Sequence, residues 1–227
     1  LPLKVQELIE EGLFTFKNWQ KRKIPISLIA SDKVSAVRGN NYKIRRQLAS
    51  RLPASELSVF GDYWNTSFPR KLAHRIAVLK FSIQSKTFPN LIEIYGNLFQ
   101  SYGSARGTVE NKHDVVQNSK FSLVIENDDN YISEKLIDAL LGGSIPIFIG
   151  GDFRRVGIPE ASVVSNLFTP EEILNYIKSF KEEDISQRLA ETRNWISSPA
   201  FLNGWQGDKV YYSCGDKIHT YFRNSVS

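Results

Sequence analysis

The chain has 227 residues, of which 41% are hydrophobic and 23% charged, a composition typical of a soluble globular protein with a sizeable core. The formal net charge of +5 serves solubility or favours an anionic partner, such as a phosphorylated small molecule or an anionic membrane face. No apolar run approaches the roughly 20 residues of a membrane span, and the lack of basic repeats interleaved with aromatic residues argues against nucleic acid.

The first residues and the cysteine content bear on the compartment. The start, LPLKVQELIEEG, lacks the basic and apolar regions of a signal peptide, and the single cysteine, Cys214, excludes an internal disulfide. These features predict a cytoplasmic protein, with peripheral association at the inner membrane face as a further expectation. The chain contains no methionine, which favours a fragment of a longer protein.

The predicted elements begin with a helix over 3–20, within an N-terminal helix or linker at 1–22. A nucleotide-sugar-binding domain is expected at 23–200, with an insertion at about 60–90, and an aromatic-rich helical tail at 201–227 that packs on it. The runs expected as strands are, in chain order, IPISLIA, ELSVFGD, LIEIYGN, FSLVIEN and SIPIFIG. Helices are expected at Tyr42–Leu52, Arg70–Ser85, Tyr131–Leu141, from Thr169-Pro170 onward, and at Glu182–Trp195. Residues 112–119 are expected to form a short helix or loop, and residues 103–110 a loop.

Short apolar runs that alternate with helices predict an α/β fold, a Rossmann-like, mainly parallel sheet with flanking helices. Ligands of such sheets bind beyond the carboxyl ends of the strands. The loops SDKVSAVRGNN, YGNLFQ, ENDDNYISEK and GGDFRR follow predicted strands. We therefore expect these four loops to converge on one crevice.

The stretch VIENDDNYISEK joins a strand to a helix and carries the first candidate site. The amino end of a helix attracts anions, and Lys135 can add a full charge to a phosphate site there. Glu134 is about 100° away around the helix, so the two side chains should diverge, one toward a diol and the other toward a phosphate. In the alternative interpretation, Asp129 or Asn130 caps the helix, Glu134 complements its dipole and Lys135 lies in solvent.

Arg38, Arg45 and Arg46 follow the first predicted strand and form a second candidate phosphate site. A guanidinium group can bind two phosphate oxygens at once. The alternative is that Arg45 and Arg46 form the wet face of an amphipathic helix. No dinucleotide, P-loop, hydrolase or zinc-protease motif is present, and the three histidines lack metal-ligand spacing, so we expect no metal and no cofactor.

The segment KFSLVIENDDNYISEKLIDALLGGSIPIFIGG resembles the signature of the α-1,3-fucosyltransferases, glycosyltransferase family 10. That signature has a strand ending Phe-Glu-Asn, a polar turn, Tyr-x-Thr-Glu-Lys opening a helix, and an Ile-Pro strand followed by Gly. Ile125 and Ser133 replace its Phe and Thr. Upstream, ISLIASDK with Arg45 and Leu52, and IEIYGN followed by ENKHDVVQNSKF, are similar to the family's preceding strands, and the likeness covers roughly residues 23–180.

The resemblance implies the C-terminal, donor-binding domain of a GT-B glycosyltransferase. It implies that Lys135 and Arg45 hold the donor pyrophosphate, that Glu134 holds the ribose, and that Tyr131 and Asn127 line the phosphate and sugar site. Glu126 and Arg38 complete the expected donor-binding set.

By the same resemblance, the reaction transfers fucose from GDP-fucose to a glycan hydroxyl with inversion. A carboxylate base would deprotonate the acceptor, and this base belongs to an acceptor-side domain with no counterpart in the sequence. Two alternatives stay open. One is a GT-B transferase for another nucleotide sugar, and the other is a non-catalytic nucleotide- or carbohydrate-binding module.

Overall fold

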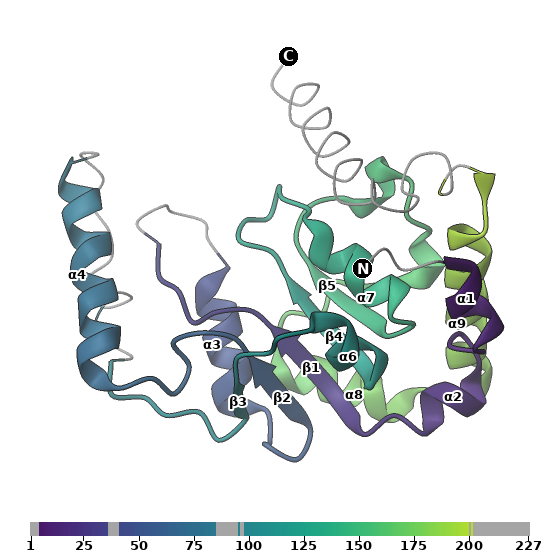
Figure 1. Ribbon diagram of the computed structural model, residues 1–227, viewed down its shortest axis with the longest axis horizontal. Helices are drawn as coiled ribbons and strands as arrows, with labels where there is room; N and C mark the ends of the chain where they lie inside the picture. The colour runs from purple at the N-terminus through teal and green to yellow at the C-terminus, as the bar shows by residue number, and fades with distance from the viewer. Residues whose placement is uncertain (1–4, 36–40, 85–94, 96–97, 200, 202–227) are drawn as a thin grey trace.

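A six-stranded parallel sheet forms the centre of the computed structural model, which describes residues 5–35, 41–84, 95, 98–199 and 201 (Figure 1). The strands are β1 (Ile24–Ile29), β2 (Leu57–Phe60), β3 (Ala105–Gly107), β4 (Ser119–Ile125), β5 (Ile145–Ile149) and β6 (Val164–Ser165). Their order is β3-β2-β1-β4-β5-β6, with every neighbouring pair parallel. This is the Rossmann order, in which the direction of winding reverses between β1 and β4.

The central strands are apolar because the sheet is covered on both faces. Every residue of β5 is buried, and so are all but one of β4. The buried hydroxyls of Ser27, Ser122 and Ser144 satisfy one another across the strands, at 3.1 and 2.8 Å between oxygens. The predicted parallel α/β sheet is therefore confirmed.

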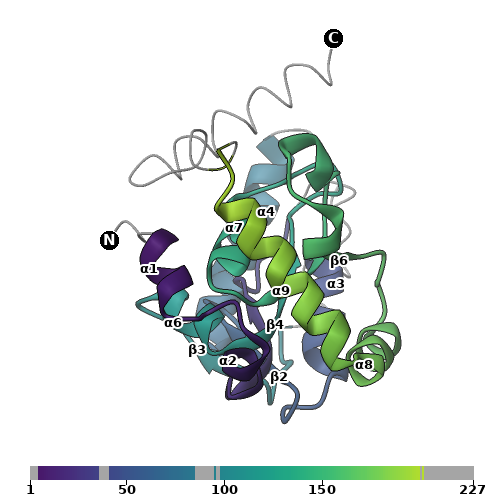
Figure 2. The same ribbon diagram turned by 90° about the vertical axis from the view of Figure 1, so that its right-hand side faces the viewer.

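Helices lie on both faces of the sheet, as Figures 1 and 2 show. On one face α6 (Lys112–Gln117) and α7 (Glu134–Leu141) pack together against β1, β4 and β5. On the other face α3 (Tyr42–Arg51) lies beside α8 (Pro170–Ser179). The expected start of α8 is confirmed, since Thr169 and Glu172 form a capping box.

The N-terminal segment forms two short helices, so the prediction of one helix over 3–20 was wrong. Gly12, at φ +68°, separates α1 (Val5–Glu10) from α2 (Phe16–Gln20). α2 packs against α9 (Glu182–Ile196). This contact brings the N-terminal and C-terminal parts of the described chain together. Leu8, Leu13, Phe14 and Trp19 are buried in the main core.

At one edge of the molecule stands α4 (Phe68–Gln84), at the far left of Figure 1. It occupies most of the described part of the stretch predicted as an insertion. Short 3-10 helices at Phe153–Val156 and Glu160–Ser162 connect β5 to β6. Among the described helices, none combines the length and apolarity that crossing a membrane requires.

The prediction of a loop throughout 103–110, next to β2, was wrong. The expected loop at 103–110 contains β3, which pairs with β2 through only two residue pairs. So short an edge strand, Ala-Arg-Gly, has no apolar alternation to reveal it. The predicted strand LIEIYGN, apart from Tyr95, and the predicted tail beyond Phe201 lie outside the described residues.

Candidate functional site

A cavity of about 470 Å³ opens at the carboxyl ends of β1 and β4, where the winding of the sheet reverses. Ligands of open α/β sheets bind at this switch point. The cavity is bounded by Ser27, Ser122 and Leu123 of the strands, by α3 and by α7. Its charged lining residues are four cations and two carboxylates: Lys33, Arg45, Lys112, Lys135, Glu134 and Asp138. The excess of cations favours an anionic ligand.

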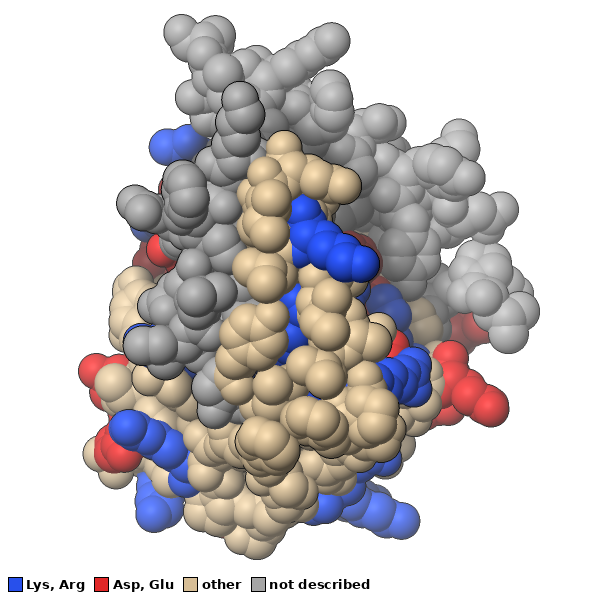
Figure 3. All heavy atoms as spheres, turned by 90° about the vertical axis from the view of Figure 1, so that its left-hand side faces the viewer, with Lys and Arg blue, Asp and Glu red and all other residues tan. Residues whose placement is uncertain are grey.

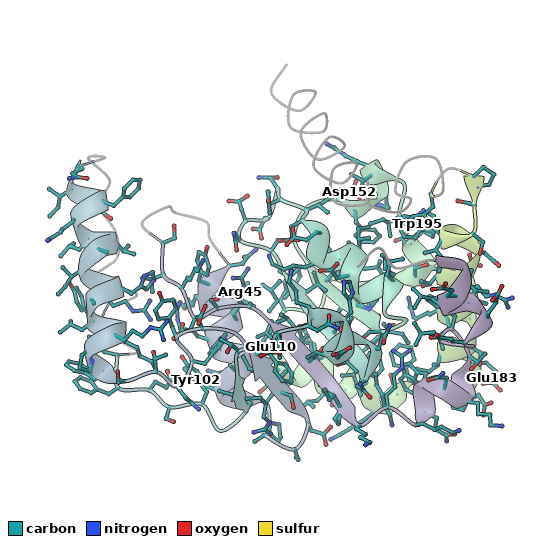
Figure 4. All side chains as sticks on the ribbon, viewed as in Figure 1. Arg45, Tyr102, Glu110, Asp152, Glu183 and Trp195 are labelled. Atoms are coloured by element: carbon teal, nitrogen blue, oxygen red, sulfur yellow. The ribbon has the colours of Figure 1, made fainter. Side chains whose placement is uncertain are left out.

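Arg45 lies in the first turn of α3, on the side that faces the end of β4 (Figure 4). Its Nη2 donates to the carbonyl oxygen of Ile125 and, at 2.8 Å, to Oδ1 of Asn127. Burial lowers the pKa of this guanidinium. The nearby Tyr42 and Glu126 side chains act in the other direction and raise the pKa, but burial has the larger effect. Its buried Nε has no hydrogen-bond partner among the described residues. Arg45 thus brings a buried charge to the cavity wall.

Glu126, the residue after β4, is fully buried and holds the connection to α7 in place. Its Oε1 accepts from the amide and the hydroxyl of Ser133, at 2.7 and 2.6 Å. Its Oε2 lies 3.0 Å from Nζ of Lys135. Both carboxylate oxygens are therefore engaged inside the protein, and Glu126 positions Lys135 at the cavity.

The helix after this connection begins at Glu134, so the predicted start at Tyr131 was wrong. Ser133 is the N-cap residue, in extended conformation, and neither Asp129 nor Asn130 caps the helix. The Ser133 hydroxyl accepts from the amide of Lys135, and the Ser133 amide donates to Glu126. Because these internal acceptors use two amides at the start of α7, the cation of Lys135 is the stronger anion-binding feature there.

Glu134 and Lys135 diverge as the helical geometry predicts. Lys135 points to Glu126, whereas Glu134 faces Lys112 of α6, with 3.9 Å between the carboxylate oxygen and Nζ. Lys112 also lies 3.7 Å from Oδ2 of Asp138, one turn further along α7. The Glu134 side chain keeps about two fifths of its surface exposed and lines the cavity.

Two of the remaining predicted site residues lie on the same connection, Asn127 at the cavity and Tyr131 outside its lining. Asn127 lines the cavity and its carbonyl oxygen accepts from the amide of Asn41, which ties α3 to the end of β4. Tyr131 is half-buried, and its carbonyl oxygen accepts from the amide of Gly151 after β5. Arg38 lies outside the described residues.

Arg46, the next residue along α3, does not line the cavity and joins a buried ionic cluster. It lies 3.6 Å from Asp32, as does Arg75 of α4. Burial raises the pKa of Asp32, while the positive charges of Arg75, Arg46 and Lys71 lower it. Arg45 and Arg46 are both buried, so the alternative that they form the wet face of α3 was wrong.

Three charged lining residues were not among the predicted site residues: Lys33, Lys112 and Asp138. Lys33 lies in the first of the four loops that were expected to converge. Lys112 belongs to the lysine-bearing segment ahead of the signature, so the resemblance contained a signal for it. Asp138 carried no such signal, because its position on the cavity wall depends on how α7 packs against α6.

Within the described ranges, no three His, Cys, Asp or Glu side chains lie together in a group that could hold a metal ion. The histidines at 74 and 113 belong to different helices, α4 and α6.

Comparisons with known proteins place the chain in a family. The family model described as glycosyltransferase family 10 (fucosyltransferase) C-term matches residues 62–198, a range that includes α4 and the connection from Glu126 to Lys135. An alpha-(1,4)-fucosyltransferase of Arabidopsis thaliana is 26% identical over 141 residues, 55% of this chain and 35% of the relative.

Two solved structures are similar over almost the whole chain. A crystal structure of an alpha1,3-fucosyltransferase with GDP matches 96% of this chain and 52% of its own, with a TM-score of 0.46 and 18% identity. A second alpha1,3-fucosyltransferase structure matches 97% and 49%, with a TM-score of 0.43 and 17% identity.

The chain thus spans about a third of the curated relative's length and about half of these two structures. The family model matches more than half of the chain and ends just after α9. The chain belongs to glycosyltransferase family 10, and the matched region is the family's C-terminal part.

Proposed function

We propose that this chain binds the nucleotide-sugar donor of a glycosyltransferase and that the donor is GDP-fucose. The observation that carries the proposal is the convergence of Arg45 and Lys135. They come from α3 and α7, far apart in sequence, and line one cavity at the switch point of the sheet. Membership of family 10 supports fucose as the transferred sugar.

The charges of the cavity suit a nucleoside diphosphate. Arg45 brings a buried guanidinium charge to the cavity wall, and Lys135 offers a partly exposed ammonium group. Guanidinium and ammonium groups form strong charge-assisted hydrogen bonds with phosphate oxygens. In this proposal the cations stabilise the departing diphosphate, and the reaction needs no metal ion.

Glu134 is the proposed ribose ligand, because a carboxylate can accept hydrogen bonds from both hydroxyls of a diol. Asn127 lines the cavity and Tyr131 lies further along the same connection, and we assign both to the phosphate and sugar end of the donor. The acceptor is a glycan hydroxyl that attacks the anomeric carbon with inversion. We assign the base that removes its proton to the acceptor-side domain, as the resemblance to the family implies.

Calorimetric titration with GDP, GDP-fucose and UDP-glucose tests the proposal. GDP and GDP-fucose should bind, UDP-glucose should bind more weakly, and EDTA should leave the affinities unchanged. Lys135→Gln and Arg45→Gln should each weaken GDP binding about tenfold to a hundredfold, the loss expected for a hydrogen bond between charged groups. Lys43→Gln is the matched control, because Lys43 lies on the exposed side of α3.

The outcomes separate the alternatives. Absence of GDP binding by the folded wild-type chain would overturn the proposal. Unchanged affinity in both variants would overturn the site assignment. Equal affinity for UDP-glucose and GDP-fucose would favour a transferase for another nucleotide sugar. Donor binding without transfer by the longest natural form of the protein would favour the binding module. Thermal unfolding of each variant shows whether a lost affinity reflects lost folding.

A further inference from the structure

A cavity of about 240 Å³ opens at the carboxyl ends of β5 and β6 and shares no lining residue with the donor cavity. This cavity, named here the β5–β6 cavity, is formed by the loop after β5 and the turn after β6, with Asp152, Asn166 and Phe168 in its lining. Because the strands are parallel, it lies at the same edge of the sheet as the donor cavity. Open parallel sheets bind their ligands at this edge.

One connection, from Glu126 to Lys135, separates the two cavities. Gly151, in the wall of the β5–β6 cavity, donates from its amide to the carbonyl oxygen of Tyr131 at 3.0 Å. Gly150 lies so close that a Cβ atom there would be 2.8 Å from Cγ of Glu126. The carboxylate of Glu126 in turn contacts Lys135 at the donor cavity. The β5–β6 cavity therefore adjoins the segment that supplies the proposed phosphate and sugar end of the donor.

The charge of the β5–β6 cavity is opposite to that of the donor cavity. Its charged lining residues are the carboxylates of Asp152 and Glu160 and the guanidinium of Arg154. An excess of carboxylates repels a phosphate group. The lining thus favours a neutral ligand that donates hydrogen bonds, such as a sugar, over a second anion.

Asp152, labelled in Figure 4, has a carboxylate oxygen that can accept from such a ligand. Its Oδ1 accepts from Nε of Arg154 at 2.7 Å, whereas its Oδ2 lies 3.6 Å from Nε of Arg155, beyond hydrogen-bond distance. The hydrogen bond from Arg154 lowers the pKa of Asp152, so the group is an anion at neutral pH. Sugar hydroxyls can donate to this carboxylate, and the amide of Asn166 can both donate and accept.

Phe168 gives the β5–β6 cavity an apolar wall that is open to solvent. The residue is 54% exposed, and its backbone amide donates to Oε2 of Glu172 at 3.0 Å, which holds it against the start of α8. The other aromatic rings of the lining, Phe148 and Phe153, pack edge to face in the core. An exposed aromatic face of this kind is a large apolar contact surface, on which the C–H face of a sugar ring can pack.

The size of the β5–β6 cavity suits one sugar ring. Its volume is about half that of the donor cavity, 240 against 470 Å³. Sites that enclose a whole drug-sized ligand have roughly 300–1,000 Å³. A ligand of the β5–β6 cavity is then held by one ring while the remainder lies outside, which fits the end of a glycan chain.

We propose that the β5–β6 cavity binds a sugar ring of the glycan acceptor through Asp152, Asn166 and Phe168. This role rests on the proposed donor function. In the transfer, the acceptor oxygen bonds to the anomeric carbon while the bond from that carbon to the diphosphate breaks, GDP leaves, and the hydroxyl proton passes to the base of the acceptor-side domain. Inversion requires attack from the side opposite the diphosphate, away from Arg45 and Lys135. The β5–β6 cavity, across the connection from these two cations, has a position consistent with this requirement.

Saturation-transfer difference NMR tests the sugar site on the full chain. The methyl β-glycosides of glucose, galactose, mannose and N-acetylglucosamine are the probes, and at least one should bind the wild type. Phe168→Ala and Asn166→Gly should each weaken that binding about fivefold, since one variant loses the apolar contact and the other a hydrogen bond. Glycine adopts the φ of +65° found at Asn166 without strain, so the second variant keeps the backbone.

The matched control is Phe99→Ala. Phe99 is 85% exposed and stacks on Phe68 of α4, at the edge of the molecule that faces the viewer in Figure 3, and it lines neither cavity. Lys and Arg side chains lie among uncharged residues on that face. The control should therefore bind the glycoside as the wild type does.

Titration with GDP separates this proposal from the donor function. GDP affinity should be unchanged in Phe168→Ala and Asn166→Gly, and GDP should not displace the glycoside, because the two cavities share no residue. Binding of none of the four probes, unchanged binding in Phe168→Ala with wild-type circular dichroism, or displacement of the glycoside by GDP overturns the proposal. Sugar binding that both variants weaken, in a wild type that does not bind GDP, overturns the donor function and the acceptor role while it places a sugar in this cavity.

Discussion

At the scale of single residues, the molecule depends on a carboxylate that a ligand would not touch. Glu126 has the position of a binding residue in the signature, one residue before Asn127. In the structure it is fully buried and accepts two hydrogen bonds from Ser133 and one from Lys135. Its function is therefore positional, since it sets both the first residue of α7 and the place of the lysine ammonium group.

Glu126→Gln tests this positional role. The amide keeps the side-chain shape but loses the negative charge that faces Lys135, so we expect a loss of about 2 kcal/mol in the free energy of unfolding. The affinity for GDP should fall as well, because Lys135 is no longer held. Urea denaturation and calorimetry measure the two effects. The control, Glu134→Gln, removes a partly exposed charge and should leave stability within about 0.5 kcal/mol, so equal losses in the two variants would contradict the argument.

At the scale of elements, the end of α7 shows how tightly the helix is set against the N-terminal segment. Gly143 follows the C-cap Gly142 and has φ +63°. A Cβ atom there would lie 2.7 Å from Nη2 of Arg22 and 3.0 Å from the carbonyl oxygen of Leu13. Arg22 has little room to move, since its guanidinium donates to Leu13 and Ser119 inside the protein.

Gly143→Ala should therefore cost more than the strain of a left-handed backbone. That strain is worth about 1 kcal/mol, and the clash with Arg22 and Leu13 should raise the total loss to about 3 kcal/mol. Gly157→Ala supplies the comparison, because Gly157 has φ +81° with no atom within 4 Å of the added Cβ. Chemical denaturation of both variants measures the difference. Equal losses would show that the N-terminal segment does not press on α7.

At the scale of the whole molecule, the N-terminal residues belong to the body of the fold. The prediction treated 1–22 as a helix or linker ahead of the main domain. Trp19 is buried, donates from Nε1 to the carbonyl oxygen of Lys120 at 2.8 Å, and meets Phe121 edge to face. The segment thus covers the amino-terminal end of β4, opposite the end where the cavity opens.

Trp19→Ala should destabilise the whole chain by about 3–5 kcal/mol, the range for removing a buried aromatic side chain. Trp19→Phe keeps most of the apolar contact and should lose only about 1 kcal/mol with the hydrogen bond to Lys120. The two midpoints of urea denaturation give these values. A wild-type midpoint for Trp19→Ala would mean that the segment is an independent linker.

Local patterns in the sequence were enough to predict the class of fold and the order of most elements. The apolar runs that became β1, β2, β4 and β5 are continuous because both faces of a parallel sheet are buried. Thr169-Pro170 marked the start of α8 through residues that lie next to one another. The same local reasoning placed the polar connection from Glu126 to Lys135 at the carboxyl end of a strand. The resemblance of this segment to family 10 was evident from its sequence motif.

The tertiary structure decided which side chains meet. Arg45 and Asn127 are 82 residues apart in sequence and lie 2.8 Å apart, whereas Arg46, next to Arg45, points to a different cluster. Tertiary contacts also buried Glu126 and moved the start of α7 to Glu134, with Ser133 as its N-cap. Sequence periodicity records which residues are apolar and how they are spaced. A buried charge, by contrast, is stabilised only by a partner brought close by folding, and that partner cannot be inferred from local spacing.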